Sequence, residues 1–275
     1  MNRLLYGVLG CLIATMAVAA GPTSVRERVE DSMVVTGTIA VTPKGTVLAY
    51  ALDHPEKLPS AVAQAVSETL PRWSFQPVLH DGKPVASKSR MSLRVVAHPI
   101  GGGNYRVMVN AAYFGDPGAA IKRTNAVRIA YPRPAIRERL AATVYMLLRI
   151  DRTGKVVDAT AEQVNLQAIA DDRTLDRYRQ LFADASVKGL RQWIYSPADP
   201  SDPAPYRILQ MPVVYSMDPR AETPYGQWQA YVPGPLQPVP WLDDKKLLAS
   251  GVDALPGDGL YGPPSLSLMT PLNSG

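Results

Sequence analysis

A short aromatic-proline motif occurs twice in this 275-residue chain and restricts the fold more than any other feature. Residues 73–77 read WSFQP and residues 193–197 read WIYSP, at a spacing of 120 positions. A glycine turn precedes each copy, at Gly45 and Gly154. An internal repeat of this kind predicts two related folding units. The matching positions are Trp73, Phe75 and Pro77 in the first copy and Trp193, Tyr195 and Pro197 in the second.

The first unit, residues 33–114, is predicted to hold strands and one helix. β-branched residues over 33–41 and 46–52 indicate two strands around the Gly45 turn. A helix is expected to start at Pro59 and Ser60, because apolar residues then recur at three- and four-residue spacing as far as Pro71. Residues 89–97 and 105–114 are predicted to be strands paired as a hairpin.

The second unit, residues 127–234, repeats this order. Residues 140–150 and 155–164 are predicted strands, and residues 171–192 a long amphipathic helix, which Gly189 would divide in a two-helix alternative. The third strand is expected at 206–217. A fourth, at 225–232, is expected to pair with it.

These elements predict an α+β fold with two related domains, each a small antiparallel sheet with a helix packed on one face. The two motif tryptophans are expected to fill the space between helix and sheet, and the motif prolines to fix the bend into the next strand. Residues 235–275 form a Pro- and Gly-rich tail without apolar periodicity, which is typical of polyproline-like or disordered chain. Within it, Trp241 is a candidate for docking on a partner, with burial as the alternative.

The N-terminus resembles a secretory signal peptide over residues 1–20. Arg3 supplies a positive start, and residues 17–19 (AVA) offer a cleavage site. The uncharged run from Leu4 to Ala20 has 17 residues, short of the ~20 that span a bilayer, although an uncleaved anchor is the alternative. The only cysteine, Cys11, lies inside this segment, so the mature chain has no disulfide. A disulfide-free secreted protein suits the bacterial periplasm.

Several function classes are disfavoured by the sequence. The net charge of +5 is spread along the chain without a basic run, so nucleic acid is not an expected partner. The three histidines have no ligand spacing, and no nucleophile motif occurs, so neither a metal, a cofactor nor an enzymatic activity is predicted. Asp151, Asp171 and Asp172 lie at a turn and a helix start, where capping explains them.

The order of strand, glycine turn, strand, helix, Trp-x-aromatic-x-Pro and closing strand resembles the C-terminal domain of the TonB family. The second unit carries the closer likeness, in residues 131–135 (YPRPA), 150–156 (IDRTGKV), 193–197 and 210–215 (QMPVVY). The first unit keeps the glycine turn, the motif and residues 82–85 (GKPV), without the Tyr-Pro opening. Together these segments cover most of residues 33–217.

The resemblance implies a function in protein recognition. TonB proteins are periplasm-spanning energy transducers of outer-membrane transport, and they bind a transporter segment by adding it as a strand to the sheet edge. Here it implies a periplasmic or outer-membrane protein partner, in or beside TonB-dependent transport, and no cofactor. The matching edge strand is residues 206–217, with partner-facing candidates Tyr206, Ile208, Gln210, Met211, Val213 and Tyr215.

Two departures from the family bear on this function. The run from Leu4 to Ala20 lacks the family's functional histidine, and only residues 21–32 stand where the family has a Pro/Lys-rich spacer. A membrane-anchored energy transducer is therefore the alternative to a periplasmic binding module. A fourth strand paired with residues 206–217 would occupy the edge, which predicts weak binding of a partner strand.

Overall fold

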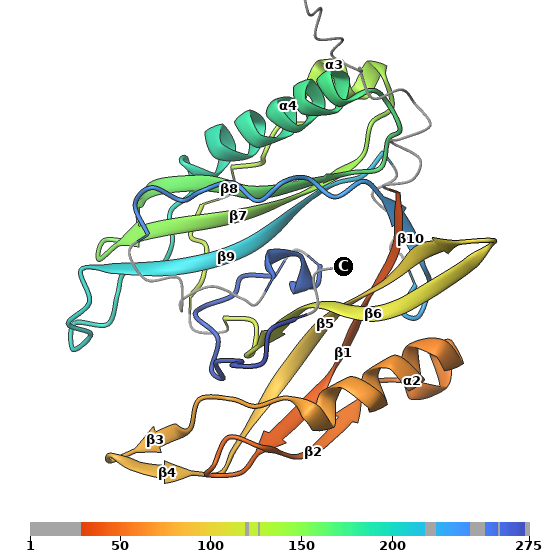
Figure 1. The fold of residues 1–275 in the computed structure, drawn as a ribbon. Helices are drawn as coiled ribbons and strands as arrows, with labels where there is room; N and C mark the ends of the chain where they lie inside the picture. The colour runs from red at the N-terminus through yellow and green to blue at the C-terminus, as the bar shows by residue number, and fades with distance from the viewer. Residues whose placement is uncertain are drawn as a thin grey trace, which may run out of the picture.

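The structure is a computed structural model that describes residues 29–118, 121–125, 127–217, 224–242, 251–257 and 259–272. The predicted signal peptide lies outside these residues. Two antiparallel sheets face each other, each with a helix on its outer side, and C-terminal chain runs between them (Figure 1). No helix in these ranges is long and apolar enough to cross a membrane. The fold is thus a mixed α and β fold with antiparallel sheets and few helices.

The first sheet has the order β10-β1-β5-β6, with β2 also paired to β1. Met91, Leu93 and Val95 alternate along β5 and point into the core beneath helix α2. The 3-10 turn η1 (Pro55–Lys57) precedes α2, the turn η2 (Leu70–Arg72) follows it, and β3 (Val78–His80) and β4 (Lys83–Val85) form a separate hairpin. The main elements are β1 (Glu30–Val41), β2 (Val47–Leu52), α2 (Ser60–Thr69), β5 (Ser87–Gly101), β6 (Asn104–Phe114) and β10 (Gln229–Tyr231).

The second sheet has the order β8-β7-β9 and supports the long helix α4. Val144, Met146 and Leu148 alternate along β7 toward α4 and share a core with Phe182 of that helix. The elements are α3 (Arg133–Arg137), β7 (Ala142–Asp151), β8 (Val156–Leu166), α4 (Asp172–Leu190) and β9 (Tyr206–Tyr215). Both sheets therefore place the strand before the glycine turn in the centre, flanked by the next strand and by the strand after the helix.

The glycine turns and the aromatic motifs meet in both halves, in the same way. The Phe75 amide donates to the Gly45 carbonyl at 2.8 Å, and the Tyr195 amide donates to the Gly154 carbonyl at 2.8 Å. Both glycines have positive φ, +81° and +92°. A Cβ added at either would lie 2.0 Å from the carbonyl oxygen of the facing aromatic residue. Glycine is required here by backbone conformation and by close approach together.

The two motif tryptophans differ in burial. Trp73 is 3% exposed and stacks edge-on against Phe75 and Phe114, which confirms its predicted place under the helix. Trp193 is only partly buried, and the Arg123 guanidinium lies 4.2 Å from the centre of its ring. Trp73 is thus the more completely enclosed of the pair.

The predicted helices and the first hairpin are confirmed. α2 and α4 lie within the expected ranges, and β5 pairs with β6. α4 is continuous through Gly189, so the two-helix alternative is wrong. A Cβ at Gly189 would come within 3.0 Å of the Ile129 side chain, which shows that this glycine serves close packing.

The predicted pairing of residues 225–232 with the third strand is wrong. β10 pairs instead with Glu30 to Ser32 of β1, in the other sheet. The Tyr225 hydroxyl supports this placement by accepting from the Thr36 amide at 3.2 Å. The choice between two sheets depends on contacts far apart in the sequence, which a local pattern does not encode.

Polyproline-like or disordered chain was expected for residues 235–275, but the described parts of this segment, residues 235–242, 251–257 and 259–272, pack into the fold. The 3-10 turn η4 (Val252–Ala254) and Tyr261 join Tyr113 and Tyr145 in a buried cluster between the sheets. Leu266 is buried in the core of the first sheet. Trp241 is also held, because its indole N–H donates to the Thr160 hydroxyl at 2.9 Å.

We expect Gly154→Ala to lower the free energy of unfolding by about 3 kcal/mol, since it combines left-handed backbone strain with overlap on the Tyr195 carbonyl. Gly45→Ala should cost a similar amount. Gly82→Ala is the matched control, because Gly82 also has positive φ but no atom lies within 4 Å of its added Cβ. It should cost about 1 kcal/mol. Urea unfolding decides, and equal losses at all three sites would contradict the close-approach argument.

Candidate functional site

The strand assigned to partner binding, β9, lies at the edge of its sheet. Within the described residues its strand partner is β7. Tyr206 and Ile208 are accessible at one end, and Val214 is 53% exposed near the other. The candidate side chains that are buried are Gln210, Met211, Val213 and Tyr215, of which the last three belong to the core under α4.

The free side of β9 is bridged at its middle by the C-terminal segment. The Gln210 amide donates to the Tyr261 carbonyl at 2.7 Å, and the Tyr261 amide donates back at 2.8 Å. Tyr261 is itself fixed, because its ring packs edge-on against Tyr113 at 5.2 Å and its hydroxyl donates to the Pro256 carbonyl at 2.6 Å. The edge is therefore occupied as expected, although by Tyr261 and not by residues 225–232.

The opposite edge of the same sheet, on β8, is covered over half its length. Leu166 and Val232 exchange two main-chain hydrogen bonds, of 3.1 and 2.7 Å, and the Gln237 amide donates to the Glu162 carbonyl at 2.7 Å. The covering segment contains prolines at 233, 235, 238 and 240, which lack the N–H needed for a full ladder. Residues 156–161 have no bridge or strand partner on this side in the part of the chain that the structure describes.

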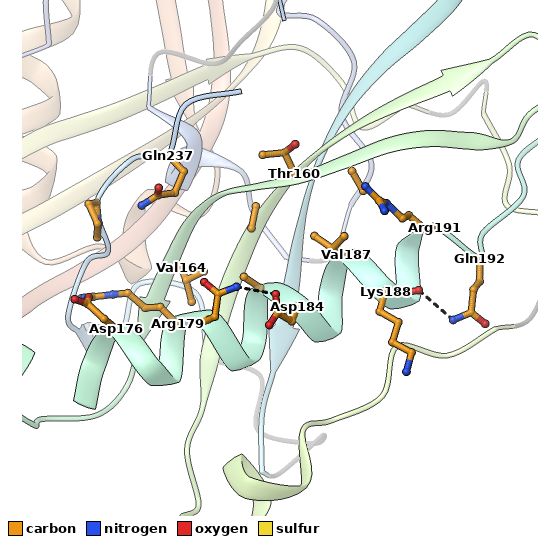
Figure 2. A pocket seen from close by; sticks show the side chains of 15 residues that line it. Thr160, Val164, Asp176, Arg179, Asp184, Val187, Lys188, Arg191, Gln192 and Gln237 are labelled. Carbon is orange, nitrogen blue, oxygen red and sulfur yellow. Dashed lines mark hydrogen bonds and ion pairs between the residues drawn. The ribbon is translucent and has the colours of Figure 1, made fainter. Parts of the chain in front are cut away.

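A groove with a volume of about 860 Å³ lies between helix α4 and the middle of β8, where residues 159–161 of the free half and Val164 of the covered half line it (Figure 2). Its floor and walls carry small apolar side chains from both elements, and Pro235 and Gln237 of the covering segment also line it. Nothing in the sequence marked this groove, because alanine and valine at these positions also suit an ordinary core. The apolar lining residues are Ala159, Ala161, Val164, Ala183 and Val187.

Charges line the helix side of the groove. Asp176 pairs with Arg179 at 3.0 Å, and Asp184 accepts from the Gln180 amide at 2.7 Å. Lys188 and Arg191 follow at the C-terminal end of α4, and the Arg191 side chain reaches toward β8 (Figure 2). Neither cation has a carboxylate within 4.0 Å among the described residues. The groove is thus positive at this end.

Glu162 is a buried carboxyl on β8 that the sequence did not single out. It is 4% exposed, and burial raises its pKa to about 7, against a weaker opposing effect of the Gln210 amide at 3.5 Å. Its side chain does not line the groove. No signal in the sequence marked Glu162, because its burial depends on Gln210 of β9 and on the covering segment at Gln237.

A second, polar cavity of about 20 Å³ lies between the sheets. It has room for about one water molecule. It is lined by Arg94 and the hydroxyls of Tyr145 and Tyr231. Burial raises the pKa of Tyr145 to about 12, so its hydroxyl stays protonated and can donate or accept. This cavity joins elements of the fold and is too small for an organic ligand.

Two of the three acids expected to be caps, Asp171 and Asp151, have that role, whereas Asp172 is the first residue of α4 itself. Asp171 accepts from the Thr174 amide at 3.1 Å at the start of α4, and Asp151 accepts from the amides of Thr153 and Lys155 in the glycine turn. The hydroxyls of Thr174 and Thr153 also donate to Asp171 and Asp151, and these hydroxyls together with the amides lower the pKa of both carboxyls. In the described ranges, no group of three or more His, Cys, Asp or Glu is placed to hold a metal ion.

Comparison with known proteins adds no relative to this description: no family model, no curated protein and no solved structure matches the chain.

We expect stability to fall as the pH rises from about 4.5 to about 7, because the unfolded chain releases the Glu162 proton in this range and the folded chain keeps it. The loss from this group is on the order of 3 kcal/mol. Glu162→Gln should remove this pH-dependent loss, so the free energy of unfolding of the variant should rise relative to that of the wild type as the pH rises. Urea unfolding between pH 4 and 8 measures this, with Glu68→Gln on the exposed side of α2 as control. A constant difference between variant and wild type would contradict the assignment.

Proposed function

We propose that this chain is a protein-recognition module of the bacterial periplasm, which binds an extended segment of a partner protein in or beside TonB-dependent outer-membrane transport. The observation that carries the proposal is the position of β9. The resemblance to the TonB C-terminal domain assigns partner binding to this strand, and β9 lies at the edge of an antiparallel sheet with a helix on one face. Main-chain hydrogen bonds supply the affinity in that mode, so it needs no catalytic side chain.

The matching strand order of the two sheets supports a division into two TonB-like domains, residues 33–114 and 127–234. The shared contact between glycine turn and aromatic motif also favours this division. β10 departs from it, because it lies in the second unit by sequence and pairs with β1 of the first. The C-terminal segment then belongs to both domains rather than following them as a separate tail.

Photo-cross-linking in cells tests the proposal. A photoreactive residue at Val214, on the exposed part of β9, should give cross-links to an envelope protein that mass spectrometry identifies as a TonB-dependent transporter. Leu79, exposed on the β3–β4 hairpin, is the control position. The same products from both positions would contradict recognition through β9. Specific products without any transporter would contradict the transport role.

The alternative, a membrane-anchored energy transducer, depends on residues 1–20. It requires that this segment stay attached and contact a proton-driven complex in the inner membrane. Intact-mass measurement on protein from a periplasmic extract separates the two readings: loss of residues 1–20 supports the binding module, whereas full-length chain found only in the inner membrane supports the transducer.

We expect a synthetic strand peptide from a TonB-dependent transporter to bind the wild-type chain weakly, because Tyr261 holds the middle of the β9 edge. Tyr261→Pro removes the N–H that donates to the Gln210 carbonyl and the ring contact with Tyr113, so binding should strengthen at least tenfold. Met269→Ala, an exposed change in the same segment, is the control. Titration by calorimetry decides. Tight binding by the wild type that is unchanged in Tyr261→Pro would contradict a closed edge.

A further inference from the structure

We infer that the groove between α4 and the free half of β8 binds an extended, acidic peptide segment, which adds to β8 as a strand and places a carboxylate against Arg191. This inference rests on the proposed function, since it names a site and the chemistry of the bound segment. It concerns the edge opposite β9, so the sheet β8-β7-β9 would have a recognition edge on each side.

The main chain of β8 offers the first requirement. Residues 156–161 extend over about 20 Å at ~3.3 Å per residue, enough for a strand of five or six residues. The chain's own segment already uses the same edge further along, where Val232 pairs with Leu166 in antiparallel register. That segment continues to the bond between Gln237 and the Glu162 carbonyl. Strand addition to this edge is therefore an arrangement that the fold already contains.

The covering segment leaves the edge of β8 after Gln237. Pro238 and Pro240 cannot donate to the ladder, and Trp241 is drawn to the Thr160 hydroxyl. The Arg149 guanidinium, on the side of the sheet away from α4, lies 5.4 Å from the centre of the Trp241 ring. The segment as described, up to Leu242, thus passes on the side of the sheet away from α4, and it does not fill the groove on the α4 side.

The shape of the groove suits alternate side chains of a bound strand. Ala159 and Ala161 on β8 face Ala183 and Val187 on α4, and these small side chains leave the hollow of about 860 Å³ between the elements. A strand laid along β8 directs every second side chain to this face. Small or medium apolar residues at those positions would fill the hollow and bury apolar surface on both partners.

Charge selects an acidic segment. Two carboxylates and three cations line the groove, so one positive charge is in excess, and the pair formed by Asp176 and Arg179 compensates itself. The excess lies with Lys188 and Arg191 at one end. Arg191 projects from the helix terminus toward β8 (Figure 2), so its guanidinium can meet a carboxylate of a strand in the groove. The carboxylate can be an acidic side chain or a free C-terminus.

A random decapeptide library, displayed with internal and with free C-terminal ends, supplies the probe. The strongest clone is synthesised and titrated by fluorescence anisotropy against the mature chain and two charge variants. We expect Arg191→Glu to weaken binding at least tenfold. Arg173→Glu is the matched control, because it makes the same change on the exposed surface of α4 outside the groove, and it should stay within twofold.

Two further experiments test whether the peptide pairs with the main chain of β8 and whether it occupies the groove. Bound peptide should slow hydrogen exchange of the amides within residues 156–161. Gln180→Trp, which fills the groove from an exposed position of α4, should abolish binding, while Arg173→Trp should not. Circular dichroism verifies that each variant is folded. Amidating the peptide C-terminus, or replacing its acidic residues by amides, shows which carboxylate meets Arg191.

Three outcomes would overturn the inference. The library could contain no binders, the affinity of the selected peptide could be unchanged by Arg191→Glu and Gln180→Trp, or sedimentation could show that a second copy of the chain occupies the β8 edge. Cross-linking through Val214 to a transporter, without binding in the groove, would leave the proposed function standing and remove this site. Binding in the groove without any transporter cross-link would leave this site standing and contradict the role in transport.

Discussion

The buried guanidinium of Arg94 joins the two sheets by hydrogen bonds. It donates to the Tyr145 hydroxyl of β7 at 2.9 Å, to the Ser32 hydroxyl of β1 at 3.1 Å and to the Asp253 carbonyl of the C-terminal segment at 2.9 Å. The Asp253 carboxylate lies 3.9 Å away and is buried as well. Truncating Arg94 would leave the Asp253 carboxylate buried without this cation, a cost of several kcal/mol. The two cores, though distinct, are therefore coupled through this cluster.

The C-terminal segment accepts hydrogen bonds from polar side chains on the inner face of the first sheet, and this explains its fixed path despite its composition. The Ala254 carbonyl accepts from the Ser92 hydroxyl at 2.5 Å, and the Gly262 carbonyl accepts from the Tyr113 hydroxyl at 3.0 Å. Each proline keeps its carbonyl acceptor but lacks an N–H donor, so a Pro-rich chain has more acceptors than donors, and the hydroxyls of Ser92 and Tyr113 supply donors. Composition indicated disorder because it carries no information on such complementary partners.

The sequence could predict the elements whose signal is local. Helical periodicity predicted α2 and α4, and two strand segments that follow each other in the sequence predicted the β5–β6 hairpin. The repeat of glycine turn and aromatic motif corresponds to the same backbone contact in both halves. The partner of β10, the burial of Glu162 and the groove at Arg191 could not be predicted, because each depends on which distant segments are neighbours. The β9 residues were expected at an edge and lie there, but the bridging Tyr261 is 46 positions beyond Tyr215.

Whether a strand edge is covered by other parts of the chain decides whether it can bind a partner strand in this fold. An uncovered edge invites pairing with other chains. Here the Ser265 amide donates to the Phe114 carbonyl at the end of β6, Tyr261 bridges β9, and Val232 begins the cover of β8. Each of these contacts is anchored by a buried neighbour in the same segment, so it persists without a partner protein. The cover of β8 ends where prolines remove the donors, and the cationic end of α4 borders the part left open. An edge exposed in this way, beside a hollow and next to Arg191, favours an acidic strand over the chain's own neutral, proline-rich cover.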